Sequence, residues 1–178
     1  MTDTRPTEPT DDPQASAQPL LHWVSAGGGR LALTHRPRLR GMPGLRAEGC
    51  SRLVTLLAGR EGAERIGALA REAGLAWTWL PLDSGRPPTG EGAWREIERG
   101  LATLAAQLSA GESLALHCSA GIHRTGMIAY ALLRAMGEEP EQALDAIERM
   151  RPVTRAGLTA AHLSFGDAIA ARMRHDAE

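Results

Sequence analysis

The fold of this chain is decided by the stretch Leu114-Ala115-Leu116-His117-Cys118-Ser119-Ala120-Gly121-Ile122-His123-Arg124-Thr125-Gly126. It begins in a short apolar run, residues 113–116, of the length expected for a strand that is covered on both faces. It continues into residues 124–136, whose apolar positions recur every three or four residues and predict a helix. The chain must turn sharply between the two, and Gly121 can adopt the positive φ that such a turn favours.

The predicted loop has the chemistry of an anion-binding site. The N–H groups at a helix start have no partner within the helix, and the helix dipole adds partial positive charge there. Arg124 can hold two oxygens of a phosphate with its planar guanidinium group. Cys118 lies in the same loop, where the pKa of a thiol can fall from about 8.5 to roughly 3.5–7.5. We therefore expect a Cys118 thiolate that attacks phosphorus; the alternative, an inert Cys118 with Arg124 in a surface ion pair, leaves Gly121 unexplained.

The run from His117 to Gly126, with five residues between its cysteine and its arginine, resembles the signature loop of the cysteine-dependent protein tyrosine phosphatase superfamily. His123 departs from that pattern, because small residues often occupy its position. The size of the chain resembles the compact, atypical dual-specificity enzymes. The resemblance implies a protein tyrosine phosphatase-like α/β fold, a phosphocysteine intermediate and no metal or other cofactor.

The resemblance also implies a role for each residue of the loop. Cys118 is the nucleophile, the Thr125 hydroxyl eases departure of the sulfur, and His117 orients the loop from beneath. The backbone N–H groups and the guanidinium group bind the phosphate oxygens. The phosphate-binding residues implied are Ser119, Ala120, Gly121, Ile122, His123 and Arg124.

Asp83 opens a Gly- and Pro-rich stretch, residues 83–90, that follows a predicted strand. The carboxyl ends of parallel strands are where sites form in α/β sheets. The placement of residues 83–90 upstream of the cysteine loop resembles that of the general-acid loop of the same superfamily. This resemblance implies that Asp83 protonates the leaving oxygen. The alternative is that Asp83 merely caps the turn.

Helix and strand patterns alternate along the rest of the chain and predict an α/β fold with a central, mostly parallel sheet flanked by helices. We expect a disordered tail over residues 1–19, which are almost devoid of apolar side chains, and one phosphatase domain over 20–175. The expected elements are a hairpin of 20–24 and 31–34, a short helix 42–49, a first parallel strand 52–57, a helix 61–73, a strand 75–82, a helix 91–108, a helix 140–150, a loop 151–158 and a last helix capped by Thr159 and ending near 174.

Composition limits the classes of function. The net charge is −1 over 178 residues, which argues against nucleic-acid or membrane partners. No apolar run reaches the roughly 20 residues of a membrane span, no apolar leader is evident, and two cysteines do not make a disulfide framework. We therefore expect a cytoplasmic protein and a monomer. All 20 basic residues are arginine, which indicates a GC-rich and hence bacterial genome.

Several readings remain open. We interpret Cys50 as a small buried residue and weigh against it a redox partner for Cys118. The arginines of residues 36–46 either attract phosphorylated substrates or form a solvated rim. His162 stands where larger tyrosine phosphatases hold the hydrolytic water with a glutamine.

The expected substrate is a phosphorylated protein, which makes the chain a protein tyrosine or dual-specificity phosphatase. One alternative keeps the chemistry and changes the substrate to an RNA 5′-triphosphate, an inositol phosphate or another small phosphate ester. An alternative of another class is a catalytically silent phosphate-binding module.

Overall fold

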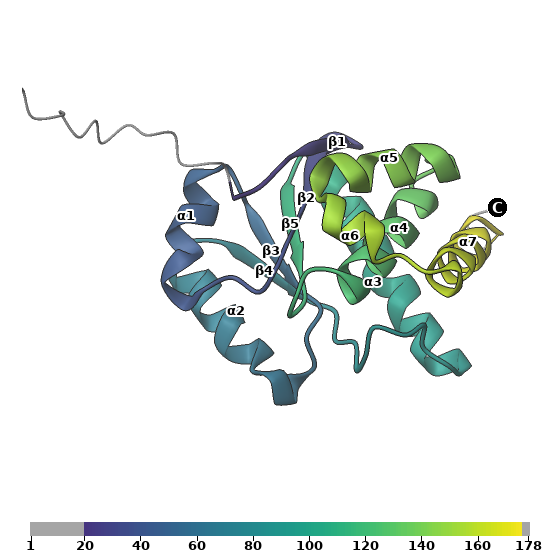
Figure 1. Ribbon diagram of the computed structural model, residues 1–178. Coiled ribbons are helices and arrows are strands. Elements are labelled where there is room, and N and C mark those ends of the chain that lie inside the picture. Colours follow the sequence, from purple (N-terminus) through teal and green to yellow (C-terminus); the bar gives the residue numbers. More distant parts are fainter. Residues whose placement is uncertain (1–19, 176–178) are drawn as a thin grey trace, which may run out of the picture.

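The computed structural model describes residues 20–175, so the disordered tail expected over residues 1–19 lies outside the described part. A five-stranded sheet in the order β1-β2-β5-β3-β4 forms the centre of the molecule (Figure 1). Its strands are β1 (Val24–Ala26), β2 (Gly29–Thr34), β3 (Arg52–Thr55), β4 (Ala76–Trp79) and β5 (Ser113–His117).

The sheet is mostly parallel, which confirms the predicted α/β class. Strand β1 forms the antiparallel edge of a hairpin with β2, whereas β2, β5, β3 and β4 run parallel to one another. The expectation that residues 52–57 form the first parallel strand is wrong, because the hairpin turn reverses the chain and aligns β2 with β5. In the register, His117 at the end of β5 lies between Thr34 of β2 and Thr55 of β3.

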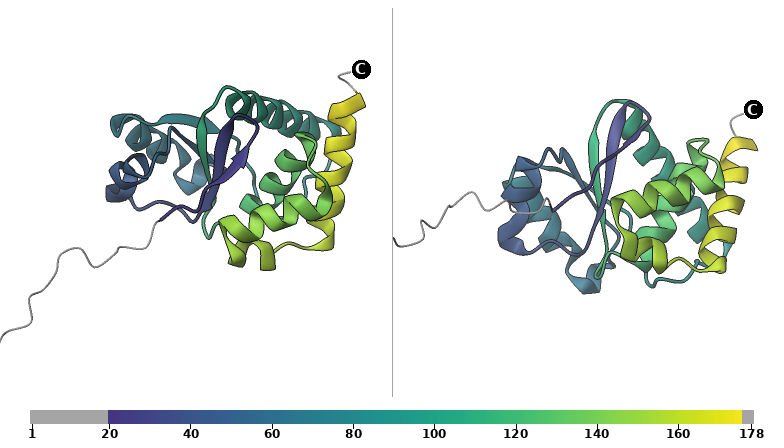
Figure 2. Two further views of the ribbon diagram at one scale, coloured as in Figure 1. Left: turned by 90° about the horizontal axis from the view of Figure 1, so that it is seen from above. Right: turned by 45° about the horizontal axis from the view of Figure 1, so that its top comes forward.

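Helices cover both faces of the sheet. Helices α1 and α2 lie on one face, and α3 to α7 lie on the other (Figures 1 and 2). The bounds are α1 (Met42–Ala47), α2 (Ala63–Glu72), α3 (Glu91–Ser109), α4 (His123–Ala135), α5 (Pro140–Met150), α6 (Pro152–Ala156) and α7 (Ala160–His175), with two 3-10 turns, η1 (Leu39–Gly41) and η2 (Gly59–Glu61).

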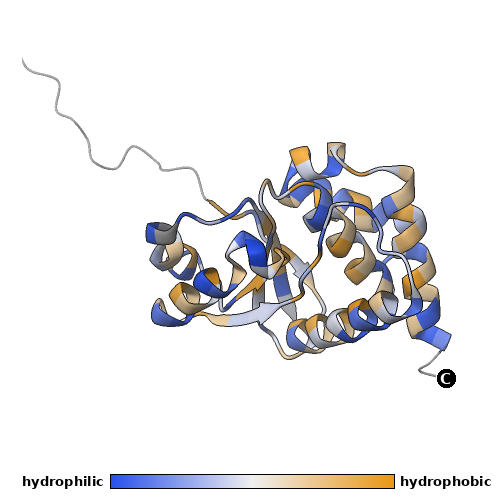
Figure 3. Ribbon diagram, turned by 90° about the horizontal axis from the view of Figure 1, so that it is seen from below, coloured by the Kyte–Doolittle hydropathy of each residue, from blue (hydrophilic) through white to orange (hydrophobic). Residues whose placement is uncertain are grey.

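The core lies around β5 and α4, the two elements that flank the cysteine loop. Every residue of β5 is buried, as expected for a central strand that is covered on both faces. Helix α4 is buried from Thr125 to Leu133 because α3, α5 and α7 surround it. The outer helices carry a hydrophilic and a hydrophobic side (Figure 3). The cysteine loop thus lies between a fully buried strand and a helix that is buried over most of its length.

Two local differences from the predicted elements matter for the site. The helix expected from residue 61 begins at Ala63, because Gly62 adopts a φ of +82° and separates it from η2. The loop expected over 151–158 contains α6, which begins at Pro152, a residue suited to the first position of a helix. Within residues 20–175, no helix has the length and apolar character needed to cross a membrane.

Candidate active site

The cysteine loop leaves β5 at His117 and enters α4 at His123. Its turn depends on Gly121, which has a φ of +70°. A Cβ at this position would lie 2.3 Å from the carbonyl oxygen of Thr34, so a side chain cannot be accommodated. The predicted strand, loop and helix are therefore present, and the neighbouring strand β2 packs against the turn.

The carbonyl groups of the loop all point outward and are all satisfied. Their donors are His117 Nδ1 for Cys118 O (3.1 Å), Arg36 N for Ser119 O (2.9 Å), Arg151 Nη2 for Ala120 O (3.1 Å), Thr154 Oγ1 for Gly121 O (2.5 Å) and Gly126 N for Ile122 O (2.8 Å). In contrast, no oxygen within residues 20–175 accepts a hydrogen bond from the backbone N–H groups of 119–124. The loop therefore presents a set of N–H donors that no oxygen of the described residues satisfies, which suits a tetrahedral oxyanion.

A buried chain of hydrogen bonds fixes the protonation state of His117. The carbonyl of Cys118 can only accept, so His117 Nδ1 carries the proton and Nε2 is an acceptor. Thr55 Oγ1 lies 2.8 Å from Nε2 and donates to it, while Trp77 Nε1 donates to Thr55 Oγ1 at 2.9 Å. Burial lowers the pKa of His117 to about 4, so the ring is neutral and supports the loop from beneath.

Cys118 is buried at the base of the loop. Burial by itself raises the pKa of a thiol, but hydrogen bonds from the Thr125 side chain and from the N–H groups of Thr125, Ile122 and Gly121 outweigh it, and the pKa of Cys118 is lowered. The Thr125 hydroxyl is itself buried and has no other hydrogen-bond partner within the described residues. The sulfur is therefore the natural acceptor for this hydroxyl.

Arg124 is held by Glu61, a residue that the sequence did not single out. Glu61 Oε2 accepts from Arg124 Nη1 at 2.6 Å, and Oε1 accepts from Nη2 at 2.9 Å. The Arg124 guanidinium group lowers the pKa of Glu61 to about 2, and Glu61 raises the pKa of Arg124. Arg124 Nη1 also donates to the carbonyl of Leu82 at 3.1 Å. The edge formed by Nε and Nη2 thus keeps the donors that can bind two phosphate oxygens.

Asp83 follows Leu82, whose carbonyl accepts the hydrogen bond from Arg124. This bond holds the start of the Asp83 segment, residues 83–90, against the cysteine loop. Its carboxylate accepts from Arg60 Nη1 at 2.7 Å, and Arg60 Nη2 donates to the Asp83 backbone carbonyl at 3.2 Å. The Asp83 side chain is 85% exposed. Adjacent residues of η2, Arg60 and Glu61, therefore hold Asp83 and Arg124 respectively.

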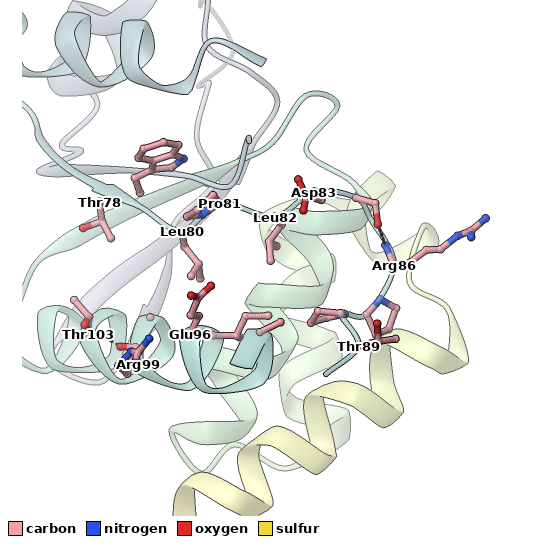
Figure 4. A pocket seen from close by; sticks show the side chains of 17 residues that line it. Thr78, Leu80, Pro81, Leu82, Asp83, Arg86, Thr89, Glu96, Arg99 and Thr103 are labelled. Carbon is pink, nitrogen blue, oxygen red and sulfur yellow. Dashed lines mark hydrogen bonds between the residues drawn. The ribbon is translucent and has the colours of Figure 1, made fainter. Parts of the chain in front are cut away.

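A hollow of about 900 Å³ lies behind the Asp83 segment, between residues 78–82 and α3. In Figure 4, Thr78, Leu80 and Leu82 face Glu96 and Thr103 of α3 across it. Figure 4 also shows that Arg86 extends away from the hollow into solvent. The Asp83 segment therefore has room behind it and packs against the cysteine loop in front.

His123 is exposed at the start of α4, beside the Asp83 segment. The other candidate histidine, His162, is buried in α7, and both of its ring nitrogens have partners in the protein. It therefore has no nitrogen left to hold a water molecule.

Cys50 is unsuited to a redox role. Burial raises the pKa of its thiol to about 11, and the sulfur contacts the backbone of Ala115. Ala115 precedes Cys118 by three residues of extended chain, or about 10 Å. This distance exceeds the reach of a disulfide, so the structure favours the interpretation of Cys50 as a small buried residue.

Comparisons with known proteins agree with this geometry. Residues 91–146 match the tyrosine phosphatase family. Among solved structures, the kinase associated phosphatase KAP with its catalytic cysteine replaced by serine superposes with a TM-score of 0.72 at 17% identity, covering 86% of this chain and 95% of that chain. The active form of Tk-PTP gives 0.68 at 18% identity over 88% and 99%, and PTPMT1 gives 0.67 at 18% over 87% and 98%. No curated protein matches the sequence.

The family match ends before α6 and begins after Asp83, so it covers the cysteine loop but neither Asp83 nor His162. The structural matches extend over almost the whole described domain and establish the fold. Taken with the family match over residues 91–146, they show that the described domain has the fold of the compact, tyrosine phosphatase-like proteins.

Proposed function

We propose that the protein is a phosphomonoester hydrolase that works through a phosphocysteine intermediate, and that its substrates are phosphorylated proteins. One observation carries the proposal: all five carbonyl groups from Cys118 to Ile122 are bonded outward. The N–H groups are thereby left for an oxyanion directly above a thiol of lowered pKa. A catalytically silent phosphate-binding module would not require a thiol of lowered pKa.

In the first step, the Cys118 sulfur attacks phosphorus as the bond to the leaving oxygen breaks. The charge on the equatorial oxygens is stabilised by the loop N–H groups and by the free edge of Arg124. Asp83, in its carboxylic acid form, exchanges its Arg60 partner for the leaving oxygen, gives that oxygen its proton and becomes a carboxylate. The products of this step are an S–P bond and a neutral alcohol or phenol.

In the second step, a water molecule attacks the phosphocysteine and gives its proton to the Asp83 carboxylate. The S–P bond breaks, inorganic phosphate leaves, and the thiolate is restored with the help of the Thr125 hydroxyl. Chemistry of this kind uses only groups of the domain and water, so we propose that it requires no cofactor.

The substrate class rests on the surroundings of the loop. Arg36 donates its backbone N–H to the carbonyl of Ser119 in the cysteine loop, and the side chains of Arg36 and Arg38 are exposed. A cationic rim of this kind suits a phosphorylated, acidic segment of a protein chain. Both cysteines are free thiols, as in a reducing compartment, so the cytoplasm remains the proposed location and a monomer the proposed state.

The test is hydrolysis of p-nitrophenyl phosphate in the presence of a chelator by the wild type, Cys118→Ser and the matched control Cys50→Ala. We expect Cys118→Ser to abolish turnover and Cys50→Ala to retain it; equal activity of wild type and Cys118→Ser would remove the nucleophile. A substrate panel then compares kcat/KM for phosphotyrosine and phosphoserine peptides, inositol phosphates and RNA 5′-triphosphate. A higher kcat/KM for either non-protein class would overturn the protein substrate.

A further inference from the structure

The Asp83 segment, residues 83–90, is tied to the rest of the domain at few points. Two ties are at its start, where Arg124 contacts Leu82 and Arg60 contacts Asp83. At its end, Trp94 donates from Nε1 to the carbonyl of Pro88 at 3.1 Å and from its backbone N–H to the carbonyl of Gly90 at 3.2 Å. In its middle, His162 Nε2 lies 2.6 Å from the carbonyl of Gly85.

The structure determines which nitrogen of His162 carries the proton. The backbone N–H of Thr159 points at Nδ1 from 3.2 Å, so Nδ1 is the acceptor. The carbonyl of Gly85 can only accept, so Nε2 carries the proton and donates to it. His162 is 3% exposed in the first turn of α7, and its backbone N–H in turn bonds the Thr159 hydroxyl. The ring is therefore fixed from both sides.

Gly85 is also the point at which the segment touches the cysteine loop. A Cβ built on Gly85 would lie 2.7 Å from the Cβ of His123 and 3.9 Å from the backbone nitrogen of Arg124. The segment therefore runs in contact with the start of α4, and Asp83 stands two residues before the contact. Because Gly85 is two residues from Asp83, a movement of Gly85 away from α4 would displace Asp83 from the cysteine loop.

We propose that His162 is a positioning residue for Asp83: its Nε2–H group holds the Gly85 carbonyl and so keeps the acid segment against the cysteine loop. The proposal rests on the proposed function, because it assigns His162 a part in the acid step alone. It also links the C-terminal helix α7 to catalysis, although α7 contributes no atom to the phosphate site.

Two substitutions separate the two hydrogen bonds of the ring. Asparagine can retain the acceptor for the Thr159 N–H group, which Nδ1 supplies, but it is too short to reach Gly85. Glutamine has its amide near the position of Nε2 and can still donate to Gly85. His162→Asn and His162→Gln are thus a matched pair, and their melting temperatures show whether each variant folds.

The expected result depends on the leaving group. We expect His162→Asn to lower kcat for phenyl phosphate, a poor leaving group, by about tenfold to a hundredfold, the cost of a misplaced catalytic group. For p-nitrophenyl phosphate, a better leaving group, the loss should be at most about threefold. His162→Gln should restore most of the rate, and His162→Asn should have no further effect in an Asp83→Ala background, because coupled residues are not additive.

The proposal would be overturned if His162→Asn lowered kcat equally for both substrates. It would also be overturned if the losses in kcat from His162→Asn and Asp83→Ala multiplied in the double variant. Hydrogen exchange of the 83–90 segment gives a readout that needs no turnover. It should be faster in His162→Asn than in His162→Gln, and equal rates would likewise count against His162. If Cys118→Ser retains activity, the proposed function fails, whereas the exchange measurement still decides whether His162 holds the segment.

Discussion

Glu61 binds Arg124 end-on, with its two carboxylate oxygens 2.6 and 2.9 Å from the two terminal nitrogens of the guanidinium group. The side chains of Arg124 and Glu61 are 11% and 26% exposed, so the pair is largely protected from water. Glu61 Oε2 also accepts the backbone N–H of Ala58 at 2.9 Å, which fixes the carboxylate. The plane of the guanidinium group is thereby set before any phosphate arrives.

Replacing this carboxylate should impair phosphate binding and turnover together. Glu61→Gln loses the charge and one of the two acceptors, so Arg124 is free to turn away from the loop. We expect kcat/KM for p-nitrophenyl phosphate to fall by about tenfold to a hundredfold, as for other small misplacements of a catalytic group, and the inhibition constant of vanadate to rise. Glu64→Gln, at an exposed position two residues into α2, is the control and should resemble wild type; an unchanged inhibition constant in Glu61→Gln would contradict the role of Glu61.

The thiols of Cys118 and Cys50 should react with an alkylating reagent over different ranges of pH, because their pKa values are shifted in opposite directions. The pKa of Cys118 is lowered, so its alkylation by iodoacetamide should persist as the pH falls below 8, whereas Cys50, with a pKa raised to about 11, should remain unmodified there. Thr125→Val removes a donor to the sulfur and should move the alkylation midpoint of Cys118 to higher pH, while Thr125→Ser should keep it. Mass spectrometry of the two cysteine peptides measures both rates, and a Cys118 midpoint above pH 8.5 would refute the thiolate.

His117 should make the stability of the domain depend on pH. Its pKa is about 4 in the folded chain and about 6.5 when unfolded, so between these values only the unfolded state binds the proton. The free energy of unfolding should therefore be fully retained above pH 6.5 and fall by about 3 kcal/mol as the pH decreases to 4. His117→Asn keeps a donor for the Cys118 carbonyl and does not titrate, so urea unfolding should show a smaller decrease. The exposed His22→Asn variant should behave as wild type.

The proposed acid role of Asp83 predicts a loss of kcat that depends on the leaving group. Asp83→Asn keeps the size of the side chain but has no proton to give, so kcat for phenyl phosphate should fall by about 10²–10⁴. The loss for p-nitrophenyl phosphate should be clearly smaller, because its phenolate leaves without help. Asp145→Asn, at an exposed position on α5, serves as the control. A uniform loss across a series of substituted phenyl phosphates would show that Asp83 is not the acid.

The parts of the site that are contiguous in the sequence could be predicted from it. The cysteine, the glycine turn and the arginine lie within one strand, loop and helix, and local rules specify their arrangement. Asp83 could be placed near them because it follows a parallel strand, at the sheet edge where such sites form.

The supporting residues could not be predicted in the same way. Glu61 lies 63 positions before Arg124, and the two meet only because β3 pairs with β5 in the sheet. The apolar pattern also does not indicate the break at Gly62, and without this break Glu61 would belong to the first turn of α2. Thr154 and Arg151 were assigned to a loop, although Pro152 at the start of α6 is a signal that could have suggested a helix there.

The separation of Cys50 from Cys118 has a consequence for oxidative stress. A low-pKa thiolate is also the form that peroxide converts to sulfenic acid. The chain contains two cysteines, and Cys50, just before β3, contacts β5 at Ala115, about three extended residues from Cys118 and too far for a protective disulfide. Recovery of an oxidised nucleophile therefore depends on a thiol supplied from outside the chain, such as glutathione, and its lifetime under peroxide is set by the cell's reducing capacity.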